Sequence, residues 1–311
     1  MAEPGDKVLA YKAYGGKIED RDEVIKLGDI LKTKLNLHNN PTVATPVPAT
    51  KNKKHLPPLC ALIGRIPPQK AHFLLNMKFL STPNLTVFFI PFNPEPTTFV
   101  TTLKGFIFPK ETKKETEEQV RDIVNNALFF GDNKSTTTTA TKRMLANHRD
   151  RIPAPLNVNV QEAARYLAAS TTVRRLDLVR KEDIGTGEGK GDPAWNVYIA
   201  PPTSNFPILL EWIALIRATK FVTIKNNAGT ARKPFTCTVC HSEDHPGGMC
   251  NFPAQPDWIT PPPTDSPALS NLLSTTQPTA VTQNPPTRRG GNRGGPRSRG
   301  TTTRGRGSTR A

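Results

Sequence analysis

The strongest constraint on this chain is the spacing of three cysteines and one histidine. Cys237, Cys240, His245 and Cys250 follow the pattern C-x2-C-x4-H-x4-C. Three thiolates and one imidazole close a tetrahedral shell around zinc and leave no position for a substrate. The spacing therefore predicts one structural zinc ion. We expect the metal to supply the folding free energy of so short a segment, roughly 10–16 kcal/mol in small zinc peptides.

The distribution of cysteine favours a metal site over a disulfide framework. The chain has four cysteines, and only Cys60 lies outside this segment. A disulfide framework spreads an even number of cysteines along a secreted chain. A chance cluster of surface thiols is the alternative. His241 is a rival ligand, but it directly follows the second cysteine and would need a tight backbone reversal, so we favour His245.

Residues 233–253 resemble the zinc knuckle of retroviral and retrotransposon Gag-type or ORF1-type nucleocapsid proteins. The sequence from Lys233-Pro-Phe-Thr-Cys237 to Cys250-Asn-Phe-Pro is similar to that of zinc-knuckle (CCHC) proteins associated with fungal mobile elements. The rest of the chain resembles that family only in layout. The resemblance implies that the metal-bound segment grips exposed bases of single-stranded RNA or DNA.

The segment departs from that family at three positions. Thr238 stands where an aromatic residue usually follows the first cysteine, and His241 and Asp244 stand where glycine is usual. These differences make metal binding a firmer expectation than base recognition. Phe235 and Phe252 are the candidates to stack on a base, and the alternative is that they pack against the knuckle.

The last part of the chain is rich in arginine and glycine. From Arg288 to Arg310 it has eight arginines and no acidic residue. Arginine contacts phosphates and stacks on bases, and glycine keeps the chain pliant. This RGG-type tail predicts nucleic-acid contacts through Arg288, Arg289, Arg293, Arg297, Arg299, Arg304, Arg306 and Arg310.

Composition points to the same kind of partner. The net charge of +16 favours a polyanion. No apolar run is long enough to span a bilayer, and no signal peptide is evident. We therefore expect an intracellular protein of the nucleus or cytoplasm with no membrane partner. No nucleophile–base pattern stands out, and the Gly185–Gly191 segment lacks the spacing of a phosphate loop, so we expect neither an enzyme nor a small-molecule substrate.

The chain divides into four parts. Residues 1–58 are polar and basic with one amphipathic helix, predicted over Glu19–Leu37; residues 59–226 form a central α+β domain; residues 233–253 form the knuckle; and residues 254–311 are a disordered Pro/Thr-rich linker and tail. Residues 38–58 are interpreted as a linker.

Within the central domain, the order from Leu85 to Ile224 is strand, helices, strand, strand, helix, strand. This order matches the βαββαβ pattern of an RRM-like domain with an enlarged first helical part. A mostly helical Gag-like capsid is the competing architecture. The predicted strands are 85–90, 173–180, 195–199 and 221–224, the helices 116–130, 161–169 and 206–218, with short helical potential over 94–109 and a Thr-rich loop over 132–141.

Three functions are consistent with these patterns. The first is zinc-dependent binding of single-stranded nucleic acid, with RNA favoured. The second is a Gag-like assembly protein of a mobile element, which would self-associate and package RNA. The third is a protein-interaction knuckle, which Thr238, Glu243 and Asp244 favour because they replace residues suited to bases.

Overall fold

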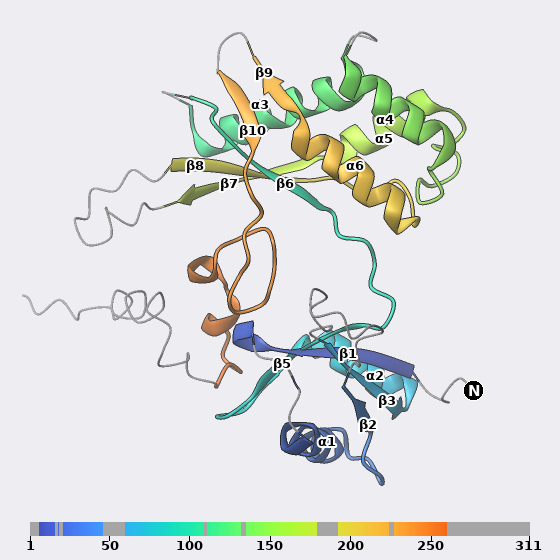
Figure 1. Cartoon of the computed structure of the whole chain (residues 1–311), viewed down its shortest axis with the longest axis vertical. Coiled ribbons are helices and arrows are strands. Elements are labelled where there is room, and N and C mark those ends of the chain that lie inside the picture. The colour runs from blue at the N-terminus through green and yellow to red at the C-terminus, as the bar shows by residue number, and fades with distance from the viewer. Residues whose placement is uncertain are drawn as a thin grey trace, which may run out of the picture.

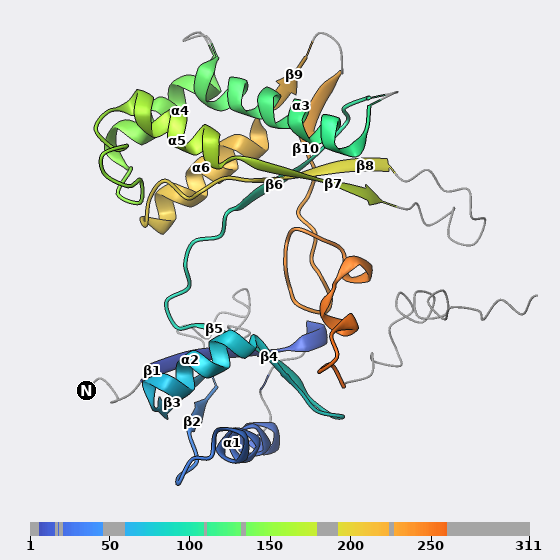
Figure 2. The same cartoon turned by 180° about the vertical axis from the view of Figure 1, so that it is seen from behind.

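The chain is seen in a computed structural model that describes residues 6–15, 18, 21–45, 60–108, 111–131, 135–178, 192–223 and 227–259. These residues form two antiparallel sheets of five strands each, together with the helices that pack on them (Figures 1 and 2). The predicted α+β class is therefore confirmed. No helix of the described residues is long and apolar enough to cross a membrane.

The first sheet has the strand order β2-β3-β1-β5-β4. Its central strand β1 pairs with β3 on one side and β5 on the other. Side chains alternate across a strand, so a sheet has two distinct faces. The strands are β1 (Asp6–Lys12), β2 (Thr42–Ala44), β3 (Cys60–Ile66), β4 (Phe79–Ser81) and β5 (Thr86–Pro91).

Two helices cover one face of the first sheet, α1 (Arg21–Leu35) and α2 (Pro68–Met77). Apolar residues of α1 recur one turn apart, and Leu27, Leu31 and Leu35 are buried against the sheet. The helix predicted over Glu19–Leu37 is confirmed by α1. The opposite face of the first sheet carries aromatic side chains such as Tyr11 and Phe88, which contact the cysteine-containing segment.

The second sheet has the order β7-β8-β6-β10-β9. In each sheet the strands therefore lie in the same order: second, third, first, fifth, fourth. The strands of the second sheet are β6 (Phe99–Lys104), β7 (Thr172–Leu178), β8 (Asp192–Tyr198), β9 (Lys220–Val222) and β10 (Ala228–Ala231). In the first sheet, β1 is followed by the short 3-10 turn η1 (Ala13–Gly15).

Helices cover one face of the second sheet and leave the other toward the first sheet (Figure 1). Trp195 and Val197 of β8 are buried on the helical side, and Asn196 and Tyr198 point to the other side. The helices are α3 (Lys113–Asn125) with its π-helical continuation η2 (Asn126–Phe130), α4 (Thr136–Asn147), α5 (Val160–Ser170) and α6 (Phe206–Ala218).

Several predicted elements are confirmed where local signals are strong. Helix α6 spans the predicted residues 206–218. Helix α5 begins at the predicted cap, where the Asn159 side chain accepts a hydrogen bond from the Glu162 amide. Strands β5, β7, β8 and β9 overlap the predicted stretches 85–90, 173–180, 195–199 and 221–224, of which residues 179–180 and 224 lie outside the described residues.

The structure places the first strand of the predicted βαββαβ order differently. Strand β5 pairs with β1 and belongs to the first sheet, and the second sheet begins with β6. The predicted helical potential over 94–109 was wrong, because residues 99–104 pair with β8. Strand β1 lies before the domain boundary expected at residue 58 and β3 lies after it. The two strands pair in the first sheet, so this boundary does not separate two folded units.

Two further expectations need correction. The Thr-rich stretch 132–141, predicted as a loop, contains the start of α4: the Ser135 side chain caps the helix by accepting from the Thr138 amide, and Thr138 and Thr141 are fully buried. Strand β2 lies within the predicted linker 38–58. Residues 254–259 of the predicted disordered part are described, and the remainder, 260–311, lies outside the described residues.

Candidate metal centre

The segment that carries the cysteines lies between the two sheets (Figures 1 and 2, orange). It leaves β10 after Ala231 and ends beside the first sheet, where the Ile259 amide donates to the Ser81 hydroxyl at 2.8 Å. Two short 3-10 turns, η4 (Gly247–Met249) and η5 (Phe252–Ala254), shape its second half.

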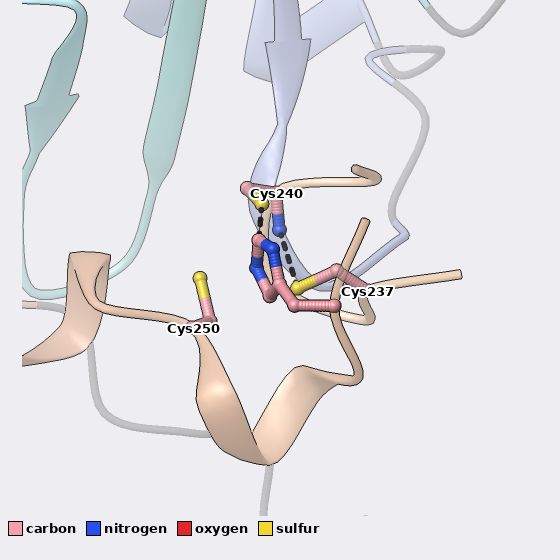
Figure 3. A group of neighbouring side chains, drawn as sticks. Cys237, Cys240 and Cys250 are labelled. Atoms are coloured by element: carbon pink, nitrogen blue, oxygen red, sulfur yellow. Dashed lines mark hydrogen bonds between the residues drawn. The ribbon is translucent and has the colours of Figure 1, made fainter. Parts of the chain in front are cut away.

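The four predicted ligands come together. The ligand atoms of Cys237, Cys240, His245 and Cys250 all lie within 4.8 Å of one another. Figure 3 shows the three cysteine side chains, which come from separate stretches of the segment and lie around a common space. Sulfur atoms bound to one tetrahedral zinc ion lie roughly 3.8 Å apart, given a Zn–S bond of about 2.3 Å. The residues present therefore fit one metal ion with four protein ligands.

Backbone hydrogen bonds fold the first half of the segment around the cysteines. The Cys237 amide donates to the Ser242 carbonyl at 2.9 Å, and the His241 amide donates to the Cys237 carbonyl at 2.9 Å. The Cys240 amide points at the Cys237 sulfur at 3.5 Å. These bonds hold the first two cysteine side chains on one side of a tight turn.

Gly247 lets the second half of the segment approach the first. A β-carbon at position 247 would lie 2.3 Å from the Thr238 hydroxyl oxygen and 3.4 Å from the Thr238 amide nitrogen. Thr238 therefore sits where the two halves of the segment meet. The close contact explains why glycine, which has no β-carbon, occupies position 247.

His241 is not part of the cluster. Its φ of 58° turns the backbone into the left-handed region, and its Nε2 lies 3.3 Å from the Lys12 carbonyl oxygen. The ring also meets Tyr11 edge-on at 5.6 Å. The tight reversal considered for His241 does occur, but it turns the ring toward the first sheet and leaves His245 with the three thiols.

Asp244 orients the histidine of the cluster. Its Oδ1 lies 2.5 Å from Nδ1 of His245, whose Nε2 faces the Cys240 sulfur at 3.5 Å. A carboxylate bound to the far nitrogen is the usual partner of a metal-binding imidazole, because it fixes both the tautomer and the ring orientation. The sequence marked Asp244 only as a residue that stands where glycine is usual in zinc knuckles.

The crowded thiols favour a positive charge at their centre. Hydrogen bonding from Cys240 and then from Cys250 holds the pKa of the Cys237 thiol well below its usual range. Contacts with Cys237 and Cys250 raise the pKa of His245 to about 10. Contacts with Cys237 and Cys250 also raise the pKa of the Cys240 thiol, so the crowded groups hold their protons unequally. A divalent metal bound between them would displace these protons.

One side of the segment packs on the aromatic face of the first sheet. The Tyr11 hydroxyl donates to the Cys240 carbonyl at 3.2 Å, and the Tyr14 amide donates to the Val239 carbonyl at 3.3 Å. Phe252 meets the Phe88 ring at 4.8 Å. The buried cluster consists of Ala13, Phe88, Cys237, Val239 and Cys240, with Tyr11, Tyr14, Phe79, Cys250, Phe252 and Trp258 packed against it.

The other side of the segment bonds to the second sheet. The Asn196 side-chain amide donates to the Asp244 carbonyl at 2.6 Å, and the Tyr198 hydroxyl donates to Asp244 Oδ2 at 3.0 Å. Burial and the Asp244 charge raise the pKa of Tyr198 to about 12, so the phenol stays a donor. Arg217 of α6 pairs with Glu243 at 2.9 Å. The acidic residues beside the cluster thus contact the second sheet and its helix.

The two candidate base-stacking residues have partners within the chain. Phe235 is buried, with the Arg232 guanidinium 3.7 Å from its ring centre. Phe252 is half-buried in the aromatic cluster. Packing within the chain is therefore the observed role of both rings. The eight predicted arginines of the tail, 288–310, lie outside the described residues.

Sequence reasoning missed the sheet residues that hold the segment, Tyr11, Phe79, Phe88 and Tyr198. No local pattern in the sequence shows which face of each sheet these aromatic side chains lie on, or that this face contacts the cysteine-containing segment.

Comparisons with family models, with curated proteins and with solved structures find no match for the chain.

The ligand assignment predicts that Cys240→Ser abolishes zinc binding by the full-length protein, because hydroxyl oxygen is a poor substitute for thiolate in a Cys3His shell. The measurement is metal content by native mass spectrometry. Cys60→Ser is the matched control, since Cys60 lies outside the cluster, and it should keep one ion per chain. Full zinc content in Cys240→Ser would refute the assignment.

The contact between Gly247 and Thr238 predicts that Gly247→Ala weakens zinc binding. The added methyl overlaps the Thr238 hydroxyl, and overpacking of this kind costs typically 1–3 kcal/mol. Competition with a chromophoric chelator measures the affinity. The double variant Gly247→Ala/Thr238→Ala removes the opposing hydroxyl and should recover most of the loss. Equal affinities for Gly247→Ala and the wild type would contradict the close approach.

Proposed function

We propose that this protein binds single-stranded nucleic acid, with RNA favoured, through a zinc-stabilised knuckle and the arginine-rich tail. The observation that carries the proposal is the convergence of three thiols and one imidazole on a single point in a chain of net charge +16. Four protein ligands fill a tetrahedral shell, so the ion would have a structural role and no open position for chemistry.

The arrangement of strands supports the proposal. In both sheets the first strand is central, flanked by the third and the last. Helices cover one face of each sheet. We infer that both units are RRM-like, an architecture that recognises single-stranded RNA on the open face of its sheet. The open face of the first sheet is covered by the knuckle and its aromatic neighbours, so the proposal assigns nucleic-acid contacts to the knuckle, the tail and the second sheet.

A Gag-like assembly role is the second candidate. The order of folded part, knuckle and basic tail supports it. A specific observation also favours self-association, because Phe206 and Leu210 expose 57% and 49% of their surface along α6. Apolar groups gathered on one helix favour contact with another protein surface.

The tail predicts a steep dependence of affinity on salt. Each phosphate neutralised on a single strand contributes a slope of roughly −0.7 in a plot of log K against log salt. Deleting residues 288–311 should flatten the slope, as measured by fluorescence anisotropy with a labelled oligouridylate. Replacing all eight tail arginines with lysine keeps the charge and should keep the slope. If deletion leaves the slope unchanged, the tail takes no part in binding.

A further inference from the structure

A cleft lies between the knuckle and the open face of the second sheet. Its volume is about 500 Å³. Strands β7 and β8 supply one wall, with Arg174, Leu176 and Asn196. The second half of the metal-binding segment supplies the other wall, with Asp244, His245, Met249, Asn251, Phe252 and Gln255.

The sheet wall offers a cation. Arg174 is exposed, and its guanidinium lies over the Tyr198 ring at 5.7 Å from the ring centre. No carboxylate of the described residues pairs with it, whereas its neighbour Arg175 is paired with Asp177 at 2.8 Å. Arg174 therefore has its hydrogen-bond donors available for an anion, and a guanidinium presents them in a fork that matches phosphate.

The knuckle wall offers apolar surface and amides. Met249 is exposed and Phe252 is half-buried, so both present apolar atoms to the cleft. Asn251 and Gln255 are exposed, and neither side-chain amide bonds to a described residue. The cleft therefore combines a guanidinium that no described carboxylate pairs with, an apolar wall and two amides able to donate and accept.

We propose that this cleft binds one nucleotide of a single strand. Arg174 contacts the phosphate, Met249 and Phe252 contact the face of the base, and Asn251 and Gln255 bond to its edge. This inference rests on the proposed function and assigns it a site outside the tail. A volume of about 500 Å³ lies within the range of small-molecule sites, roughly 300–1,000 Å³.

The chemistry of the cleft fits a nucleotide better than an acidic peptide. A carboxylate side chain would use Arg174 but would leave the apolar wall and the amides without partners. Asp244, which lines the cleft, accepts hydrogen bonds from the Ser242 and Tyr198 hydroxyls and contacts His245, so its charge is engaged within the chain. A planar base with polar edges matches both features of the knuckle wall.

The cleft also depends on the metal centre. His245 and Cys250 lie on either side of the residues that form η4, and both belong to the ligand set. Metal binding therefore fixes the position of the knuckle wall relative to the sheet wall. Contacts in the cleft should be lost when the metal is removed, whereas contacts of the tail do not require it.

The test uses the full-length zinc-bound protein and a labelled oligouridylate that contains 4-thiouridine. Arg174→Glu is compared with Arg165→Glu, which makes the same charge change at an exposed position on α5. Affinity is measured at a salt concentration that weakens the tail, and photo-crosslinked peptides are mapped by mass spectrometry. Zinc content confirms that both variants keep the metal centre.

We expect Arg174→Glu to weaken binding roughly tenfold, in line with the loss of a phosphate contact and a reversal of charge, and Arg165→Glu to bind like the wild type. Crosslinks should map to residues 249–255. The double variant Asn251→Ala/Gln255→Ala should also bind more weakly while keeping its zinc.

Equal affinities for Arg174→Glu and Arg165→Glu, or crosslinks confined to residues 288–311, would overturn the cleft and leave the proposed function standing. A wild-type protein that binds no oligonucleotide would overturn the proposed function and the cleft together. Displacement of the oligonucleotide by an acidic peptide but not by uridine monophosphate would overturn the nucleotide as the occupant.

Discussion

The contacts around the four metal ligands connect the two halves of this fold. On one side, the Tyr11 hydroxyl bonds to the Cys240 carbonyl, and Phe252 packs on Phe88. On the other side, the Asp244 carboxylate contacts the imidazole of His245 and accepts a hydrogen bond from the Tyr198 hydroxyl of β8. A metal bound by the ligands would hold both sets of contacts at fixed separation. The segment thus acts as a joint between the sheets, and a bound metal would stabilise that joint.

The segment 232–259 is short, yet it makes specific contacts with both sheets. Residues 232–259 bury only a few large apolar side chains, chiefly Phe235 and Val239, so neighbouring surfaces supply much of their contact area. A metal bound by the four ligands would add to their stability. The aromatic face of the first sheet supplies one such surface, and aromatic pairs contribute about 0.5–1.5 kcal/mol each beyond buried area. The cleft beside β7 and β8 is a consequence of the same arrangement, because the joint holds the segment against the second sheet while leaving part of that face uncovered.

Features that depend on residues close together in the sequence could be predicted, and features that depend on residues far apart could not. The ligand set depends on spacing within fourteen residues, and helices α5 and α6 have local caps and apolar periodicity. Strand β6 was missed because its pairing with β8 joins residues more than ninety positions apart. Helix α4 was missed because its threonines, polar by composition, are buried and bonded inside the fold, as Thr138 is to the Ala127 carbonyl.

The site was predictable only in part for the same reason. Local spacing identified the four ligands, and the choice of His245 over His241 followed from the cost of a backbone reversal. The partners of the segment lie more than forty residues away in Asn196 and Tyr198, and more than two hundred residues away in Tyr11. No local pattern relates such positions, so the joining of the two sheets emerged only from the structure.

The central claim is that the metal centre fixes the two sheets relative to each other. The direct measurement is the distance distribution between spin labels attached through unnatural amino acids at Lys34 of α1 and Arg165 of α5, two exposed positions away from the cysteines. With zinc bound we predict one narrow distribution, and after chelation, with loss of the ion verified by mass spectrometry, a broad one. A distribution that stays equally narrow without zinc would contradict the account.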